Sequence, residues 1–246
     1  MTEPVKLPRS FYDRPTLDVA HDLIGKVLVH DRRGIVTSGV IVEAEAYIGE
    51  SDPACHAAPG PTARNAPLYG PPGFAYVYLN YGIHCLVNIV TEPTGSPAAV
   101  LLRALEPLDG IAAMRRRRRR RAKGRRVGDL QRLADADLCR GPGNLTTAMG
   151  ITLAENRIDL LGERLYVEDR GIAFSRVQWG PRIGISSGTD RPWRVFAPDS
   201  PAVSGRPAAA TRAGRRQTAS FPPPPPRTGG RPPHTPSDPP APARRP

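Results

Sequence analysis

Residues 26–47 read KVLVHDRRGIVTSGVIVEAEAY. β-Branched and apolar residues dominate Lys26–His30 and Ile35–Tyr47, which is typical of β-strands. The four residues between them, Asp31 to Gly34, are residue types that favour a turn. This stretch therefore predicts an antiparallel hairpin with a long second strand.

The segments around this hairpin predict more strands and a few short helices. Strands are expected at Phe74–Asn80, Ile83–Thr91, Ala98–Leu105, Arg164–Glu168, Arg182–Ser186 and Trp193–Ala197. Helices are expected where Leu17, Ala20, Leu23 and Ile24 precede Gly25, after Asp109 as a cap, and at Pro142–Met149. Because the strands arrive as hairpins, we predict an antiparallel α+β fold. No glycine-rich loop of the dinucleotide or P-loop type is present.

The positive charge of the chain is concentrated in two segments. The formal net charge of the 246 residues is +12. Residues 115–126 contain ten basic residues and no acid, and residues 205–246 contain eight arginines and one aspartate. Together they carry +17, which leaves −5 for the other 192 residues. Net charge alone therefore does not establish nucleic-acid binding. Genome composition is an equally good explanation of the Arg115–Arg121 run, because alanine, glycine and proline, whose codons are GC-rich, are also abundant.

Residues 205–246 differ in composition from the rest of the chain. They hold 13 of the 30 prolines, including Pro222 to Pro226, and almost no aliphatic residues. Such a segment cannot bury enough apolar surface to offset its chain entropy, so we expect a disordered tail. The folded domain is expected to span residues 1–204.

Cysteine content and hydropathy indicate the compartment. Three cysteines, Cys55, Cys85 and Cys139, are too few and too scattered for a disulfide framework. Residues 1–10 lack the apolar core of a signal peptide, and no segment approaches the roughly 20 apolar residues of a membrane helix. We expect a soluble, cytoplasmic protein.

The strand ending at Tyr47 contains candidate catalytic groups. Because strand side chains alternate, Glu43, Glu45 and Tyr47 share one face. A solvated outer face is the ordinary interpretation of such glutamates. The alternative is a carboxylate beside an aromatic wall, which suits a general base.

Tyrosine is clustered between residues 47 and 81, where five of the seven occur. Tyr76 and Tyr78 share a strand face, and Asn80-Tyr81-Gly82 has the composition of a hairpin tip. An aromatic-rich packed sheet would account for the cluster. A stacking platform with a protruding wedge at Tyr81 is the functional alternative, because aromatic stacking on a nucleobase is worth about 1–3 kcal/mol.

Two adjacent pairs, Cys55-His56 and His84-Cys85, are the only metal candidates. Four such ligands could form a tetrahedral zinc site, and a zinc hydrolase is one hypothesis. Neighbours on a strand point to opposite faces, so His84 and Cys85 would not converge easily. A Ser-His-Asp site has no supporting elbow motif.

Several motifs together resemble the alkyladenine (3-methyladenine) DNA glycosylase family. The resemblance covers roughly residues 7–204. It rests on Val42–Tyr47, His56, Arg64-Asn65, Tyr76–Tyr78, Tyr81-Gly82, Asn88, Leu101–Pro107 and Gly141-Pro142. It implies a single α+β domain around a curved antiparallel sheet. It also implies a base-excision enzyme that flips damaged purines out of duplex DNA and hydrolyses the N-glycosidic bond.

The resemblance also implies roles for individual residues. Glu45 would be the general base that activates water. Tyr47, His56 and Tyr78 would enclose the flipped base. The remaining roles are a base-edge contact at the backbone of Ala54, exclusion of some normal purines by Asn88, Arg103 near the water and the nucleotide backbone, and Tyr81 as the intercalating wedge.

The implied chemistry needs neither metal nor cofactor. One carboxylate activates the water, and an electron-rich cage suits a cationic alkylated purine. A lyase would need an amine for a Schiff base, but Lys6 and Lys26 lie outside the pocket motifs and Lys123 lies in the arginine block. We therefore expect a monofunctional, monomeric enzyme acting on duplex DNA and associated with the nucleoid. The alternative is a non-catalytic, arginine-rich nucleic-acid-binding protein.

Four features depart from the family pattern. Cys85 replaces an aromatic residue, and Leu68-Tyr69 stands where Met-Phe is common. Both are expected to alter pocket packing. The Arg115–Arg121 run and the proline-rich tail are additions whose effect on DNA affinity the sequence leaves open.

Overall fold

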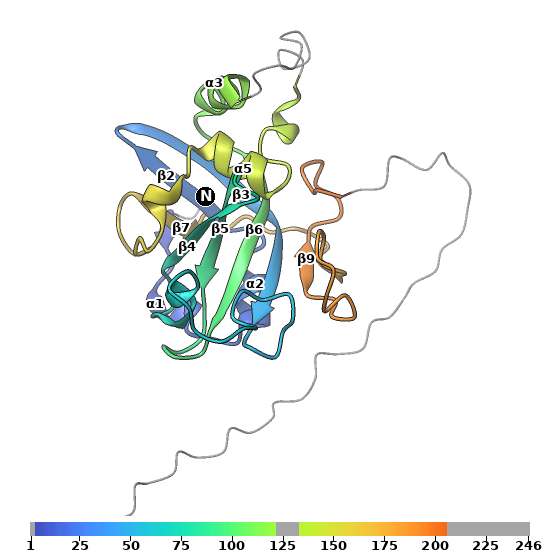
Figure 1. Cartoon of the computed structure of the whole chain (residues 1–246). Coiled ribbons are helices and arrows are strands. Elements are labelled where there is room, and N and C mark those ends of the chain that lie inside the picture. Colours follow the sequence, from blue (N-terminus) through green and yellow to red (C-terminus); the bar gives the residue numbers. More distant parts are fainter. Residues whose placement is uncertain (1–2, 122–132, 206–246) are drawn as a thin grey trace, which may run out of the picture. The chain divides into compact units, whose positions relative to one another are not determined.

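The computed structural model describes residues 3–121 and 133–205. One antiparallel sheet runs through this part of the chain, with short helices around it (Figure 1). The strands are β1 (Val5–Lys6), β2 (Val27–Arg32), β3 (Ile35–Ile48), β4 (Ala75–Asn80), β5 (His84–Val90), β6 (Ala98–Pro107), β7 (Leu165–Asp169), β8 (Gln178–Gly180) and β9 (Arg194–Phe196). The helices are α1 (Arg9–Tyr12), α2 (Thr16–Asp22), α3 (Ile111–Arg121) and α5 (Pro142–Met149), with 3-10 turns η1 (Ala66–Tyr69), η2 (Asp135–Asp137) and η3 (Leu153–Glu155).

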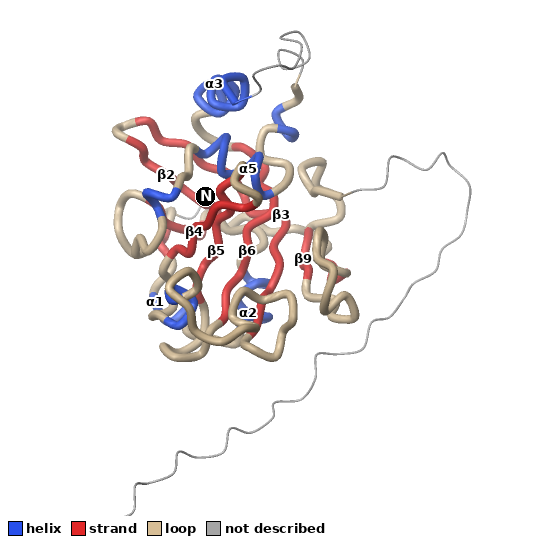
Figure 2. The backbone as a smooth tube through the Cα atoms, in the orientation of Figure 1, coloured by secondary structure: helices blue, strands red, loops and turns tan. Residues whose placement is uncertain are grey.

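The strands follow the order β1-β7-β2-β3-β6-β5-β4, and β9 joins β3 to β8. Every pairing between them is antiparallel. The sheet curls along its length, with helices at its ends and on one side (Figure 2). The predicted α+β domain around a curved antiparallel sheet, with flanking helices, is confirmed.

The hairpin predicted for residues 26–47 forms from β2 and β3. β2 ends at Arg32 and β3 begins at Ile35, so the turn has two residues instead of the four expected. Arg33 and Gly34 both have positive φ, 58° and 77°. Two left-handed residues give the turn the same twist as the strands, which allows a two-residue connection.

A β-bulge in β3 reverses the direction of its side chains. The register against β6 shifts between Ile41 and Glu43 and again before Ala44. As a result Ile41, Ala44 and Ala46 all face the main core, although strict alternation would separate Ile41 from Ala44. Glu43 and Glu45 therefore point away from that core.

The main core lies between the sheet and helices α2 and α5. It contains large, fully buried side chains such as Tyr12, Leu102 and Leu145. α5 can approach β5 closely because residue 143 is a glycine, and the space beside it would not hold a side chain. A Cβ atom there would lie 2.7 Å from Cγ of His84. Among the described residues, no helix has the length and apolar character needed to cross a membrane.

One predicted strand and one predicted helix cap are wrong, although the helix that was expected after Asp109 forms as α3. Arg182–Ser186 is not a strand, and β8 already ends at Gly180. Within the predicted strand, Gly184 has a left-handed φ of 78°, and the side chain of Arg182 forms a buried ion pair with Asp52. Asp109 does not cap α3. Its carboxylate accepts hydrogen bonds from Ser38 (2.5 Å) and Arg170 (3.2 Å), and Gly110 precedes the helix. The disorder expected for the tail concerns residues outside the described part of the chain.

Candidate functional site

A pocket of about 440 Å³ opens beside β3, β4, β5 and β6. Its walls combine aromatic rings with a few polar groups. They include Tyr47, Ala54, His56, Tyr76, Tyr78, Tyr81, Asn88, Arg103, Pro142 and Ile183. The six residues predicted to form the base-binding pocket, and the predicted wedge, thus line one cavity.

Glu45 lies behind the wall of this pocket and is fully buried. Oε2 accepts hydrogen bonds from the Tyr47 hydroxyl (2.9 Å) and from Nη1 of Arg103 (3.1 Å). Oε1 accepts one from the backbone N–H of Ile183 (2.7 Å). All three donors line the pocket. The solvated-face interpretation of this strand is therefore wrong.

Glu43 is also fully buried and shares Arg103 with Glu45. It accepts from Nε of Arg103 (3.0 Å), Nε of Arg194 (2.7 Å), and the N–H and hydroxyl of Ser204 (2.6 and 2.9 Å). Burial lowers the pKa of Arg103, but the carboxylates of Glu45 and Glu43 raise it, and the net shift is upward. Arg103 therefore stays charged and balances both carboxylates.

The aromatic wall of the pocket is uncharged. Burial raises the pKa of Tyr76 and of Tyr78 to about 12. Burial, and then Glu45, raise the pKa of Tyr47. Burial, and then the charge of Arg64, lower the pKa of His56. Neutral, electron-rich rings are therefore available to a ligand at neutral pH.

The rings of this wall are fixed against each other. The His56 ring lies edge-on to Tyr78 with centroids 4.4 Å apart, and Tyr76 stacks on Tyr78 at 5.4 Å. Nδ1 of His56 is 2.9 Å from the Tyr76 hydroxyl. Tyr76 is thus a pocket residue to which the family resemblance assigned no role, although its strand face, shared with Tyr78, had indicated a stacking platform.

Ala54 and Asn88 present little freedom to a ligand. The N–H of Ala54 donates to Asp52 (3.2 Å), so its carbonyl is the backbone polar atom that remains for a ligand. The amide of Asn88 donates to the Tyr76 carbonyl (3.0 Å) and is buried. Both residues therefore offer fixed polar atoms rather than adaptable ones.

Tyr81 stands at the tip of the β4–β5 hairpin. Its side chain is 88% exposed and its φ is 48°. Gly82 also has positive φ, and Ile83 N–H donates to the Asn80 carbonyl (3.0 Å), which closes the turn. The predicted tip position of Tyr81 is confirmed, and the ring projects at the pocket mouth.

A buried ion pair that sequence reasoning missed holds the Ile183 segment in place. Both Nη atoms of Arg182 meet the two carboxylate oxygens of Asp52, at 2.6 and 2.8 Å. Neither side chain is exposed, and the guanidinium lies over the ring of Tyr47 at 4.7 Å. No signal in the sequence connects two residues 130 positions apart.

The zinc hypothesis is wrong for the described residues, which contain no group of three or more side chains that could hold a metal ion. Cys55 and His56 belong to the pocket loop. The carbonyl of Cys85 accepts from Thr146 of α5, and its side chain packs on the main core. Cys85 therefore does not line the pocket, contrary to expectation, whereas Leu68 does.

Comparisons with known proteins point in one direction. A model of the methylpurine-DNA glycosylase family matches residues 10–201. Over 204 residues the chain is 48% identical to a provisionally named 3-methyladenine DNA glycosylase of Methanocella arvoryzae, covering 81% of this chain and 96% of that protein. Similarly named proteins of Prosthecochloris aestuarii and Burkholderia lata are 46% and 45% identical. They cover 80% and 81% of this chain, and 89% and 91% of their own lengths.

Proposed function

Because this chain belongs to the methylpurine-DNA glycosylase family and is thus a hydrolase of N-glycosyl bonds, we propose that it flips alkylated or deaminated purines from duplex DNA and releases them. The observation that carries this proposal is the buried carboxylate of Glu45. Its donors Tyr47, Arg103 and Ile183 all line an aromatic pocket large enough for a base.

Glu45 is the general base in this proposal. Its oxygens are held by three donors, so the carboxylate cannot rotate away from the pocket. It would take a proton from water as the water attacks the anomeric carbon. Arg103 would neutralise the carboxylate and contact the nucleotide backbone. These steps use one carboxylate and require neither metal nor cofactor.

Tyr47, His56 and Tyr78 would enclose the flipped base. Neutral aromatic faces attract a cationic alkylated purine, which is already a good leaving group. A neutral deaminated purine needs further help, such as protonation of the leaving base. The Ala54 carbonyl and the fixed amide of Asn88 would read the edge of the base and reject some normal purines.

Tyr81 would fill the gap that the extruded nucleotide leaves. Flipping costs a few kcal/mol of unstacking and unpairing. A ring that stacks on the neighbouring bases offsets part of this cost. The exposure of Tyr81 beside the pocket mouth supports this role.

The catalytic domain is proposed to span residues 1–204 and to act as a monomer on duplex DNA in the cytoplasm. Ser204 supports this boundary, because its N–H and hydroxyl both donate to Glu43. Lys6 and Lys26, the lysines in the described part of the chain, do not line the pocket described above, and Lys123 belongs to the arginine block of the sequence. We therefore propose a monofunctional enzyme rather than a lyase.

The substitution Glu45→Gln tests the function. It keeps the size of the side chain but removes its basicity, so we expect single-turnover release of hypoxanthine or 3-methyladenine to fall by about 10²–10⁴-fold. Release is measured as alkali-induced strand breaks, and lesion-DNA affinity should persist. Glu163→Gln, which removes an exposed carboxylate, should leave release unchanged. Unchanged release by Glu45→Gln would remove the assigned role.

A further inference from the structure

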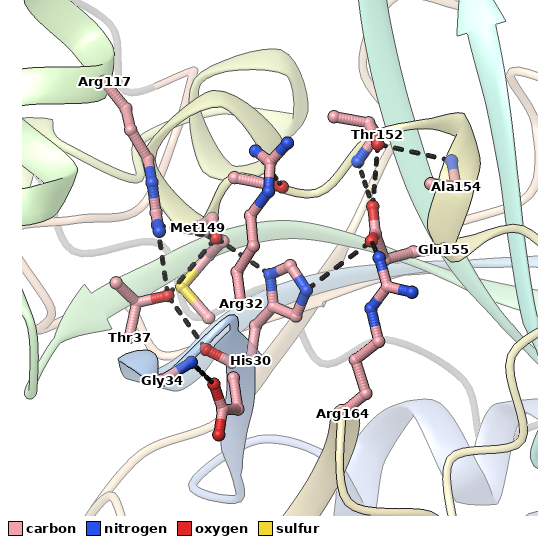
Figure 3. Close-up of polar contacts among 12 residues, drawn as sticks. His30, Arg32, Gly34, Thr37, Arg117, Met149, Thr152, Ala154, Glu155 and Arg164 are labelled. Carbon is pink, nitrogen blue, oxygen red and sulfur yellow. Dashed lines mark hydrogen bonds and ion pairs between the residues drawn. The ribbon is translucent and has the colours of Figure 1, made fainter.

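The seven consecutive arginines of α3 divide into two groups. Three of them are bound to neighbouring segments. Arg115 donates to the Leu133 carbonyl (2.6 Å), Arg117 to those of Ala148 and Met149 (3.0 and 2.8 Å), and Arg118 to that of Asp137 (3.0 Å). Figure 3 shows Arg117 reaching Thr37 and Met149. These three arginines fasten α3 to the rest of the domain.

The other four arginines are exposed: Arg116, Arg119, Arg120 and Arg121, here called the arginine track. Within residues 3–121 and 133–205, none of the four makes an ion pair or a side-chain hydrogen bond. Arg116, Arg119 and Arg120 have the i, i+3, i+4 spacing of one helix face. Like charges at this spacing destabilise a helix by a few tenths of a kcal/mol per pair.

Stabilisation of α3 does not account for the arginine track. Cations in the last turn of a helix stabilise it by about 0.3–1 kcal/mol through the helix dipole. However, the cations here are crowded enough to disfavour one another. Burial, and then the charges of Arg32 and Arg116, lower the pKa of Arg117. The surface therefore carries uncompensated positive charge that an external anion would neutralise.

The helix that carries the arginine track is linked to the β4–β5 hairpin through α5, which packs on both α3 and β5. α3 packs on α5 (Figure 1), and the first residue of α5, Pro142, lines the pocket. His84 lies three residues after Tyr81 at the base of the hairpin. Burial, and then the charges of Arg121 and Arg118, lower the pKa of His84. The end of α3 is thus close enough to act on the hairpin electrostatically.

We propose that the arginine track binds the phosphates of the duplex that flanks the flipped nucleotide. The identity of this partner rests on the proposed function. The six helical residues from Arg116 to Arg121 span about 9 Å, which matches two to three base pairs of duplex at roughly 3.4 Å each. Guanidinium groups pair with phosphate oxygens in a fork geometry. The contact is blind to sequence and to damage, so it would hold the enzyme on DNA while the pocket selects the base.

The test is the salt dependence of binding to an undamaged duplex. The full-length variant with all four arginines changed to Gln is compared with the wild type by fluorescence anisotropy between 50 and 200 mM KCl. Each lost phosphate contact lowers the slope of log K against log salt by about 0.9, so we expect a slope shallower by about 3–4. Because the variant relieves like-charge repulsion, its melting temperature should not fall, which separates lost contacts from lost folding.

Two controls make the result specific. Changing the same four residues to Lys preserves the charge and should preserve the slope. Arg157→Gln removes an exposed arginine in the turn after η3 and should change neither affinity nor slope. An unchanged slope in the Gln variant overturns the proposal. A Gln variant that binds the duplex as the wild type does, but loses affinity for single-stranded RNA in the same assay, overturns it as well. Binding to an undamaged duplex needs no excision, so these outcomes are independent of whether the wild type releases a damaged base.

Discussion

Glu43 and Glu45 lie two residues apart, and both are excluded from solvent. They share one donor, and each has further donors of its own. Arg103 serves both, Arg194 and Ser204 serve Glu43, and Tyr47 and Ile183 serve Glu45. Burying one of these charges without its partners would cost several kcal/mol. The alternation of β3 predicted that the two glutamates share a face. The partners that make burial possible come from distant segments, and no pattern near residue 45 reveals them.

Arg182 is predicted to act on the reaction through Ile183. Arg182→Lys keeps the charge but loses the two-point contact with Asp52, so the N–H that holds Glu45 should shift. A displacement of about 1 Å near the reacting groups can cost roughly 100-fold in rate. We expect single-turnover release to fall by this order, while lesion-DNA affinity changes little.

Stability is the control for Arg182, because breaking a buried pair costs about 3–5 kcal/mol. The rate is therefore measured at a temperature where thermal unfolding shows the variant to be folded. A folded Arg182→Lys variant with the wild-type rate would show that Ile183 is held by other contacts.

At the scale of elements, a bulge and a turn place the chemistry. The bulge at residues 41–44 of β3 turns Glu43 and Glu45 away from the main core. The β4–β5 turn, with two residues at positive φ, leaves Tyr81 exposed. The Asn80-Tyr81-Gly82 composition predicted the turn, because asparagine and glycine tolerate its geometry. The bulge has no such signature, since it depends on the registers of β6 and β9.

Tyr81→Ser tests the hairpin. Stacking of one aromatic ring on a base is worth about 1–3 kcal/mol, so lesion-duplex affinity should fall about 5- to 150-fold. Serine tolerates positive φ no worse than tyrosine, so the melting temperature should hold. Leu153→Ser removes a side chain that is 52% exposed on η3 and serves as the matched control. Equal affinity of the Tyr81→Ser and Leu153→Ser variants for lesion DNA would remove the wedge role.

At the scale of the whole molecule, four segments meet around one buried histidine. Nδ1–H of His30 on β2 donates to the Met149 carbonyl at the end of α5 (3.0 Å), and Nε2 lies 3.7 Å from Glu155 (Figure 3). Glu155 also accepts from Arg164, just before β7, and from the Thr152 N–H (2.6 Å). Burial, the largest cause, lowers the pKa of His30, Met149 and Glu155 raise it, Arg117 and Arg164 lower it, and the net shift is downward.

His30 therefore links folding to pH. Since its pKa is lower in the folded state, the unfolded chain binds the proton first as the pH falls below about 6.5. The free energy of unfolding should decrease below that pH, by at most about 1.4 kcal/mol per pH unit from this group. Above that pH the contribution is constant.

The prediction for His30 is checked by urea unfolding between pH 5 and 8. His30→Asn removes the titrating group and leaves a cavity. The variant should be less stable at pH 8 but should lose less stability between pH 7 and 5 than the wild type. Parallel pH profiles for the two proteins would assign the dependence to other groups.

The hairpins, the α+β class and the family could be predicted from the sequence, because these depend on local alternation, turn residues and short motifs such as Val42–Tyr47. The aromatic and polar residues that the structure places around one pocket were also named as site candidates from the sequence. Tertiary structure decided what depends on residues far apart in the chain: the burial of Glu43 and Glu45, the Asp52–Arg182 pair, and the separation of Cys55 from Cys85. It also divided the arginine run into anchored and exposed groups, since the partners of Arg115, Arg117 and Arg118 are carbonyls that every residue carries. A composition cannot show which carbonyls a fold brings within reach.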